Sequence, residues 1–227
     1  SERGKLAARL RDAYGAASTG ERAAALRELW GDGRDGEVRY ARQVLTAYAA
    51  ARLAPIDVLV NNAGVAPALV PLAQTTLDEW RRVMSINLDG AFLGVKHAIR
   101  AMTGRGGAIV NVSSVAGLVG MPLNGAYSPA KAGVLLLTKC AALECAQMDP
   151  PIRVNAVHPG YIRTDMVGAI SDTLGAERFE RRVRKTVPLK RLGDAQDIAE
   201  AIVFLASSQS KFTTGSSLVV DGGWTAQ

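Results

Sequence analysis

A tyrosine and a lysine four residues apart, Tyr127 and Lys131, follow shortly after a serine pair, Ser113 and Ser114. On a helix, residues at i and i+4 share one face, so the phenol and the ammonium would lie together. A phenol ionises near pH ~10, and a neighbouring positive charge stabilises its ionised form. Tyr127 could therefore exchange a proton near neutral pH, as an acid toward a carbonyl or as a base toward an alcohol.

Ser114 and Asn87 complete the candidate catalytic set. Ser114 ends a predicted strand and could hydrogen-bond the same substrate oxygen, which would hold that oxygen beside the phenol. Asn87 lies inside a predicted helix, where an amide is an ordinary surface residue unless it joins a polar relay. A Tyr-x-x-x-Lys pair alone arises by chance, so the prediction rests on the ordered set Asn87, Ser114, Tyr127 and Lys131 with these local contexts.

Alternating apolar and helical patterns from residue 56 onward are the elements that would position these residues. Strands are predicted at 56–62, 107–114, 152–160 and 216–223, and helices at 76–102, 128–147 and 194–207. Strands buried on both faces and separated by helices imply a parallel sheet with right-handed crossovers. The sequence therefore predicts a single-domain α/β fold with a doubly wound, Rossmann-like, mainly parallel sheet, which binds ligands beyond the carboxyl ends of its strands.

Residues 1–55 differ from the rest of the chain. They carry helical patterns and no β-rich run of strand length, and the run "YGAASTGERAA" has Glu21 where a phosphate-binding turn would need glycine. Since no strand precedes it, this run is interpreted as an interhelical turn. We predict one domain over 1–227, with an atypical or incomplete segment at 1–55 and the catalytic portion at 56–227.

Composition and charge limit the partners of the chain. No apolar run is long enough to cross a bilayer and "SERGKLAARL" at the start lacks an apolar signal core, so we expect a cytoplasmic protein with no membrane partner. The net charge is +6, but the basic residues are scattered among acids except at 178–191, which is typical of a solvated helix face. The sequence thus predicts no nucleic-acid partner. Cys140 and Cys145 are predicted to be buried thiols.

From about residue 56 to the C-terminus the chain resembles a short-chain dehydrogenase/reductase of the single-domain type. The resemblance rests on the catalytic set above, on "NNAG" at 61–64, on "HPGYIRT" at 158–164 and on the closing "VVDGG". It implies that the serine polarises the substrate oxygen, the tyrosine transfers the proton, and the lysine binds nicotinamide ribose and lowers the pKa of the tyrosine. It also implies that the asparagine holds a water linking the lysine to solvent, and that a hydride moves to or from NAD or NADP.

The same resemblance assigns the residues that would bind the cofactor. They are Asn61, Ala63, Gly64, Tyr127, Lys131, Pro159, Gly160, Ile162 and Thr164. Ile162 is expected at the nicotinamide carboxamide and Thr164 at a phosphate. His158 is interpreted as a packed histidine, not a catalyst. The segment 165–189, which shows no core pattern throughout, corresponds to the variable substrate lid; the candidate pocket residues are Met121, Leu123, Val167 and Ile170.

Within the family, "NLDGAFLG" and the C-terminal run "SKFTTGSSLVVDGGWTAQ" resemble the bacterial secondary-alcohol and cyclic-alcohol dehydrogenases, including the R-specific enzymes. This likeness implies reversible, NAD(P)(H)-dependent oxidation of a small-molecule secondary alcohol to a ketone, by a homo-oligomer, either a dimer or a tetramer. It also implies a structural Mg²⁺ held by Gln227 at a subunit contact, with a frayed C-terminus as the equal alternative.

One motif of the family is missing from the sequence. A strand followed by Thr-Gly-x-x-x-Gly-x-Gly would present backbone N–H groups to the pyrophosphate, and the residue ending the second strand would choose between NAD and NADP. Three explanations stay open. The sequence omits segments of an ordinary dehydrogenase, or its first half is rebuilt and the catalytic set performs non-redox chemistry such as dehydration or cyclisation. In the third, the chain is a non-catalytic subunit that pairs with an active homologue.

Overall fold

The computed structural model describes residues 56–67 and 69–226. Within them lies a parallel sheet of order β1–β2–β3–β4, formed by β1 (Val58–Asn61), β2 (Gly107–Val112), β3 (Ile152–Pro159) and β4 (Ser217–Val220). These strands fall inside the four predicted ranges. The helices predicted in 1–55 and the metal ligand predicted at Gln227 lie outside the described residues.

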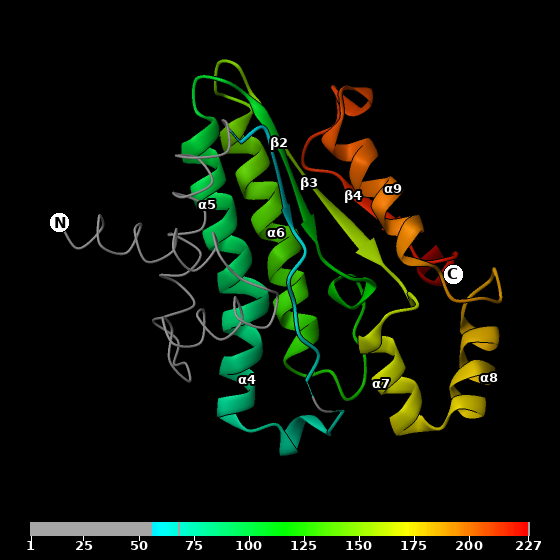
Figure 1. The fold of residues 1–227 in the computed structure, drawn as a ribbon. Helices are drawn as coiled ribbons and strands as arrows, with labels where there is room; N and C mark the ends of the chain where they lie inside the picture. The colour runs from blue at the N-terminus through cyan, green and yellow to red at the C-terminus, as the bar shows by residue number, and fades with distance from the viewer. Residues whose placement is uncertain (1–55, 68, 227) are drawn as a thin grey trace, which may run out of the picture. The chain divides into compact units, whose positions relative to one another are not determined.

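Helices cover both faces of this sheet (Figure 1). On one face lie α5 (Gly90–Met102) and α6 (Tyr127–Cys145), which pack with Ile109 of β2. On the other face lies α9 (Ala195–Ala206), which packs with Val110 of the same strand. Because consecutive strand residues enter opposite layers, the sheet is buried on both sides. The predicted α/β fold with a doubly wound parallel sheet is confirmed.

A π-helical turn interrupts the helix predicted over 76–102. The chain runs through α4 (Leu77–Met84), then the π-helical turn η2 (Ser85–Asp89), and continues directly as α5. A π-helical turn holds an extra residue, so it changes the direction in which the side chains of that turn point. Asn87 lies in this turn and is only 2% exposed. The interruption therefore places an amide inside the protein that a regular helix pattern would leave at the surface.

Two helices, α7 (Asp165–Leu174) and α8 (Ala176–Thr186), form the segment predicted as a lid. They follow β3 and lie beyond the carboxyl end of that strand (Figure 1). The expectation of a segment without a core pattern is wrong, because Phe179, Val183 and Val187 are buried in one cluster. Phe179 and Val183, four residues apart, lie on one face of α8, and Val187 follows directly after the end of this helix. This segment, which keeps the name lid from the prediction, is a pair of folded helices with its own apolar contacts.

Two expectations about surfaces can be compared with the structure. Of the residues that the structure describes, none belongs to a helix that is both long and apolar enough to cross a bilayer. Cys145 is buried as predicted, whereas Cys140 is exposed, so the prediction of two buried thiols is wrong for Cys140. The two positions are five residues apart on α6, which turns them away from each other.

An arginine of β3 caps the carboxyl end of α9. Arg153 Nη1 donates to the carbonyl oxygen of Leu205 at 2.7 Å and to Ser210 Oγ at 2.8 Å, and Nη2 donates to the carbonyls of Ala206 at 3.1 Å and Ser207 at 3.0 Å. The last carbonyls of a helix have no partner within the helix and carry partial negative charge. One guanidinium therefore satisfies these carbonyls and fixes α9 against the sheet.

Replacing Arg153 with Met should lower the free energy of unfolding by about 2–4 kcal/mol, because the carbonyls at the end of α9 lose charge-assisted hydrogen bonds. Urea denaturation of the purified variant measures this loss. The matched control is Arg178→Met, which removes a charge from the exposed surface of α8. Equal unfolding free energies for the two variants would contradict the capping role.

Candidate active site

A cavity of about 690 Å³ lies at the carboxyl edge of the sheet. Its walls come from the ends of β1, β2 and β3, from the first turns of α6 and α7, and from α9. This is the place where doubly wound sheets bind ligands. The lining is mainly apolar, with a small polar set that comprises Asn62, Ser113, Ser114, Tyr127, Lys131 and Thr164.

Ser114 and Tyr127 meet on one wall of the cavity. Ser114 follows β2, and its hydroxyl oxygen accepts a hydrogen bond from the N–H of Ala116 at 3.1 Å. An interaction of this hydroxyl with the phenol of Tyr127, the first residue of α6, lowers the pKa of the phenol. The N–H of Ala116 thus orients a serine hydroxyl that acts on the phenol. The structure brings this predicted pair together.

Lys131 lies one helical turn beyond Tyr127 and is 4% exposed. Its ammonium donates to the carbonyl of Val112 at 2.9 Å, and the hydroxyl of Ser113 donates back to the carbonyl of Lys131 at 2.8 Å. These two bonds fix the end of β2 to the start of α6. Burial lowers the pKa of Lys131 to about 8, because the charged form loses its hydration.

The pKa of Tyr127 is raised by burial, and the hydrogen bond from Ser114 lowers it by a smaller amount. The sequence led us to expect a lowered pKa, caused by Lys131. In the structure the ammonium lies over the ring, 5.7 Å from its centroid, and is hydrogen-bonded to Val112. Desolvation of the phenolate therefore dominates, and Tyr127 carries its proton at neutral pH.

Asn87 holds the segment that follows β1. Its amide oxygen accepts from the N–H of Val65 at 2.8 Å, and its amide nitrogen donates to the carbonyl of Val65 at 2.8 Å. A β-carbon on Gly64 would lie 2.9 Å from the Asn87 oxygen and 3.4 Å from Lys131 Nζ, so only glycine fits between them. Asn87 is not among the residues that line the cavity; it affects the site by holding the backbone next to Gly64.

Eight of the nine predicted cofactor residues line the cavity; they are Ala63, Gly64, Tyr127, Lys131, Pro159, Gly160, Ile162 and Thr164. Asn61 is the exception, because its amide nitrogen donates to Asn111 at 2.8 Å and to the carbonyl of Ala91 at 3.3 Å. A β-carbon on Gly160 would lie 2.8 Å from the α-carbon of Asp221. The close packing of the ends of β3 and β4 therefore requires a glycine at this position, whether or not a ligand also needs it.

Sequence reasoning missed the wall that α9 contributes. Of the four pocket residues proposed from the sequence, Val167 lines the cavity and Met121 does not; Leu123 is exposed, and Ile170 packs inside the lid. The missed lining residues include Val60, Asn62, Val112, Met166, Ala195, Ile198, Ala199 and Ile202. The apolar spacing of α9 reads as ordinary core packing, so the sequence carries no signal that separates a cavity wall from a core.

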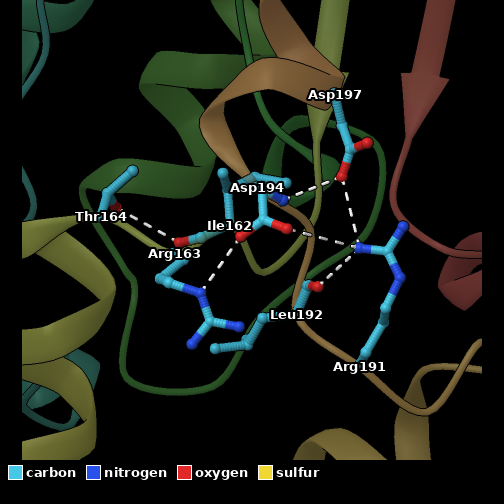
Figure 2. Close-up of polar contacts among 7 residues, drawn as sticks. All are labelled: Ile162, Arg163, Thr164, Arg191, Leu192, Asp194 and Asp197. Carbon is cyan, nitrogen blue, oxygen red and sulfur yellow. Dashed lines mark hydrogen bonds and ion pairs between the residues drawn. The ribbon is translucent and has the colours of Figure 1, made fainter.

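Both ends of the lid are joined to the start of α9 (Figure 2). Arg163, which precedes α7, pairs with Asp194 at 3.1 Å, and Arg191, which follows α8, pairs with Asp197 at 3.4 Å. A backbone hydrogen bond connects the same two segments, since the N–H of Gly193 donates to the carbonyl of Tyr161 at 2.9 Å. These contacts set the position of Thr164, which begins the lid.

The residues of the cavity suit a nicotinamide dinucleotide. Lys131 has three N–H donors, and the hydrogen bond found for it among the described residues goes to Val112. The others can meet ribose hydroxyls, and the glycines at 64 and 160 keep the backbone free of side chains beside them. The volume of about 690 Å³ accommodates the reactive half of such a cofactor together with a small substrate. No cluster of metal-ligating acids, histidines and cysteines occurs in the described part of the chain.

Comparisons with known proteins agree with this geometry. A family model described as enoyl-(acyl carrier protein) reductase matches residues 24–225. The NADP-dependent (R)-specific alcohol dehydrogenase of Lentilactobacillus kefiri is 47% identical over 76% of this chain and 68% of its own length. The trans-4-hydroxycyclohexanecarboxylate dehydrogenase of Sinomonas cyclohexanicum is 43% identical over 77% of this chain, which spans 62% of that relative.

Among solved structures, a gluconate 5-dehydrogenase from Burkholderia cenocepacia J2315, in complex with NADP and tartrate, superposes with a TM-score of 0.77. It shares 32% identity and covers 92% of this chain and 83% of its own. The chain belongs to the short-chain dehydrogenase/reductase family, and the NAD(P)-dependent enzyme class predicted for it is confirmed. The family match begins at residue 24, inside the segment that the sequence patterns set apart as atypical.

Proposed function

We propose that this protein interconverts a secondary alcohol and a ketone with NAD(H) or NADP(H). The observation that carries the proposal is the convergence of Ser114, Tyr127 and Lys131 on one wall of a cavity at the carboxyl edge of the sheet. The alcohol dehydrogenase activity named for the Lentilactobacillus kefiri relative supports the reaction class. NADP in that name, and in the Burkholderia cenocepacia complex, supports a nicotinamide cofactor without choosing between its two forms.

In the proposed reaction Tyr127 gives its proton to the oxygen of the ketone, or takes it from the alcohol. The bound cofactor would supply or accept the hydride at the carbon. Ser114 would donate a hydrogen bond to the same oxygen, which places that oxygen next to the phenol and reduces the distance the proton must cross. Its own hydroxyl is oriented by the N–H of Ala116.

Lys131 has two proposed roles. Its ammonium would bind the ribose of the cofactor, and its positive charge would stabilise the phenolate that forms when Tyr127 gives up its proton. Asn87 would hold the segment at Gly64, which closes the site beside the ammonium. Pro159, Gly160, Ile162 and Thr164 would form the opposite side of the cofactor site.

A fluorescence titration of NADH and NADPH, followed by a screen of alcohols and ketones, tests the proposal. The sample is protein whose intact mass agrees with 23.9 kDa. Saturable binding and turnover of a ketone are the expected results. Turnover that depends on Tyr127 without a dinucleotide would point to non-redox chemistry. Activity that appears only with a homologous partner would make the chain a non-catalytic subunit.

We also propose a homo-oligomer, a dimer or tetramer, formed through the outer faces of α5 and α6. Phe92, Leu136 and Leu143 on these helices are 47%, 61% and 74% exposed, which is an apolar surface that a second copy could cover. Light scattering on the purified chain tests this, and a mass of one chain would contradict it. The cytoplasmic location and the Mg²⁺ site at Gln227 stay predictions from the sequence.

A further inference from the structure

His158 lies in β3, directly behind the catalytic wall. It is fully buried, and its strand position is opposite Val219 of β4. Its Nδ1 is 3.0 Å from the carbonyl oxygen of Ser114. His158 therefore connects the third strand of the sheet to the residue that would orient the substrate oxygen.

The hydrogen-bond partner fixes the tautomer of His158. A carbonyl oxygen can only accept a hydrogen bond, so Nδ1 must carry the proton. The other ring nitrogen, Nε2, is buried and has no hydrogen-bond partner in the described part of the chain. Burial lowers the pKa of His158, the bond to Ser114 raises it by less, and the charges of Lys131 and Lys139 lower it further. The imidazole is therefore neutral, and its single N–H, at Nδ1, donates to the carbonyl of Ser114.

Ser114 is held from three sides. Its carbonyl oxygen accepts from His158 and also from the N–H of Gly117 at 2.9 Å, and its hydroxyl accepts from Ala116. The bonds from Ala116 and Gly117 are local and belong to one short turn. The N–H of Ser113 donates to the carbonyl of Val157 in β3 at 2.8 Å, which fixes the chain just before the turn. The bond from His158 joins Ser114 itself to the same strand, so it holds the start of the turn relative to the sheet.

We propose that His158 is a positioning residue for Ser114. Its Nδ1–H holds the peptide of Ser114 in the orientation in which the serine hydroxyl meets Tyr127, and it does not itself touch the substrate. The role rests on the proposed function, in which Ser114 and Tyr127 act on one substrate oxygen. Losing the donor frees the turn, so the serine hydroxyl leaves the phenol for part of the time and kcat falls.

Two amide variants separate positioning from packing. In His158→Asn the side-chain nitrogen can occupy the place of Nδ1, whereas in His158→Gln the donor lies one bond further out. We expect kcat for ketone reduction to stay within about threefold in His158→Asn and to fall about tenfold in His158→Gln, with dinucleotide affinity within about twofold in both. A packing role predicts the reverse order, because Asn leaves the larger cavity. The control is His97→Gln, which removes the other histidine of the chain. His97 lies in α5, and its Nε2 is also buried without a hydrogen-bond partner among the described residues.

Nitrogen NMR of the two histidines at neutral pH tests the contact independently of activity. The expected result is the Nδ1–H tautomer for His158, assigned by the loss of the other signal in His97→Gln. The Nε2–H tautomer, equal kcat in both His158 variants, or a larger fall in the Asn variant would overturn the proposal. If the wild-type protein reduces no ketone, the proposed function fails and the positioning role with it, while the tautomer still decides whether His158 contacts Ser114.

Discussion

Replacing Tyr127 with Phe should lower the rate of ketone reduction by about a thousandfold, since the variant has no group that can give a proton to the forming alkoxide. The ring and its packing at the start of α6 are unchanged. Dinucleotide affinity should therefore stay within about twofold, so the loss falls on kcat. Stopped-flow absorbance of NADPH, together with a fluorescence titration, measures both quantities.

The matched control is Tyr161→Phe, which removes a phenol hydroxyl outside the large cavity. Tyr161 stacks on Trp224 at 4.7 Å between ring centroids and lies edge-on to Phe179. These contacts use the ring, so we expect turnover close to that of the wild type. Unchanged turnover in Tyr127→Phe would exclude the mechanism, whatever the control shows.

The raised pKa of Tyr127 predicts how the rates of ketone reduction and alcohol oxidation depend on pH. The phenol is protonated through neutral pH, so ketone reduction should be constant there and should fall above about pH 8, where Lys131 loses the charge that stabilises the phenolate. Alcohol oxidation needs the ionised form and should rise with pH over the same range. Rates of both directions, measured across pH with Tyr127→Phe as the blank, check the sign.

Replacing Lys131 with Met should remove activity and at the same time stabilise the fold. A fall in pKa from the 10.5 of a free lysine to about 8 means that burying the charge costs about 3 kcal/mol. The variant also loses the hydrogen bond to Val112, which offsets about 1–1.5 kcal/mol. We expect a net gain of about 1–2 kcal/mol in the free energy of unfolding at neutral pH.

The pH dependence of this gain follows from the two pKa values. Below pH 8 the lysine is charged in the folded and the unfolded chain, so the full cost is present. Between pH 8 and 10.5 the folded protein releases the proton while the unfolded chain keeps it, so wild-type stability rises with pH. The advantage of Lys131→Met should therefore shrink as pH rises through this window.

Urea denaturation at neutral and moderately alkaline pH measures the difference. Readings stay below pH ~10, where unfolded tyrosines ionise and the raised pKa of Tyr127 acts in the opposite direction. Lys139→Met is the control, because Lys139 is exposed on the same helix and its loss should change stability little at any pH. A less stable Lys131→Met at neutral pH would show that the buried ammonium contributes to the fold.

The strands and most helices were predictable because each buried strand gives a continuous apolar run and each helix a period near 3.6. The catalytic set was predictable because Ser114 ends a strand and Tyr127 begins a helix. Other features depend on packing that a linear pattern does not encode. The side chain of Asn87 points inward because it lies in a π-helical turn. The buried residues of α8, Phe179 and Val183, stand in an arginine-rich run whose composition is typical of an exposed helix. His158 was interpreted as packed, and its contact with Ser114 needed coordinates.

The backbone bridge between Ile162 and Gly193 has a consequence for how such proteins diversify. Since the chain leaves the end of β3 and comes back beside that exit at this bridge before it enters α9, the intervening α7 and α8 can be exchanged, lengthened or shortened without moving β3 or α9. A recombined gene could thus inherit new selectivity in a single event while keeping its proton-transfer machinery intact.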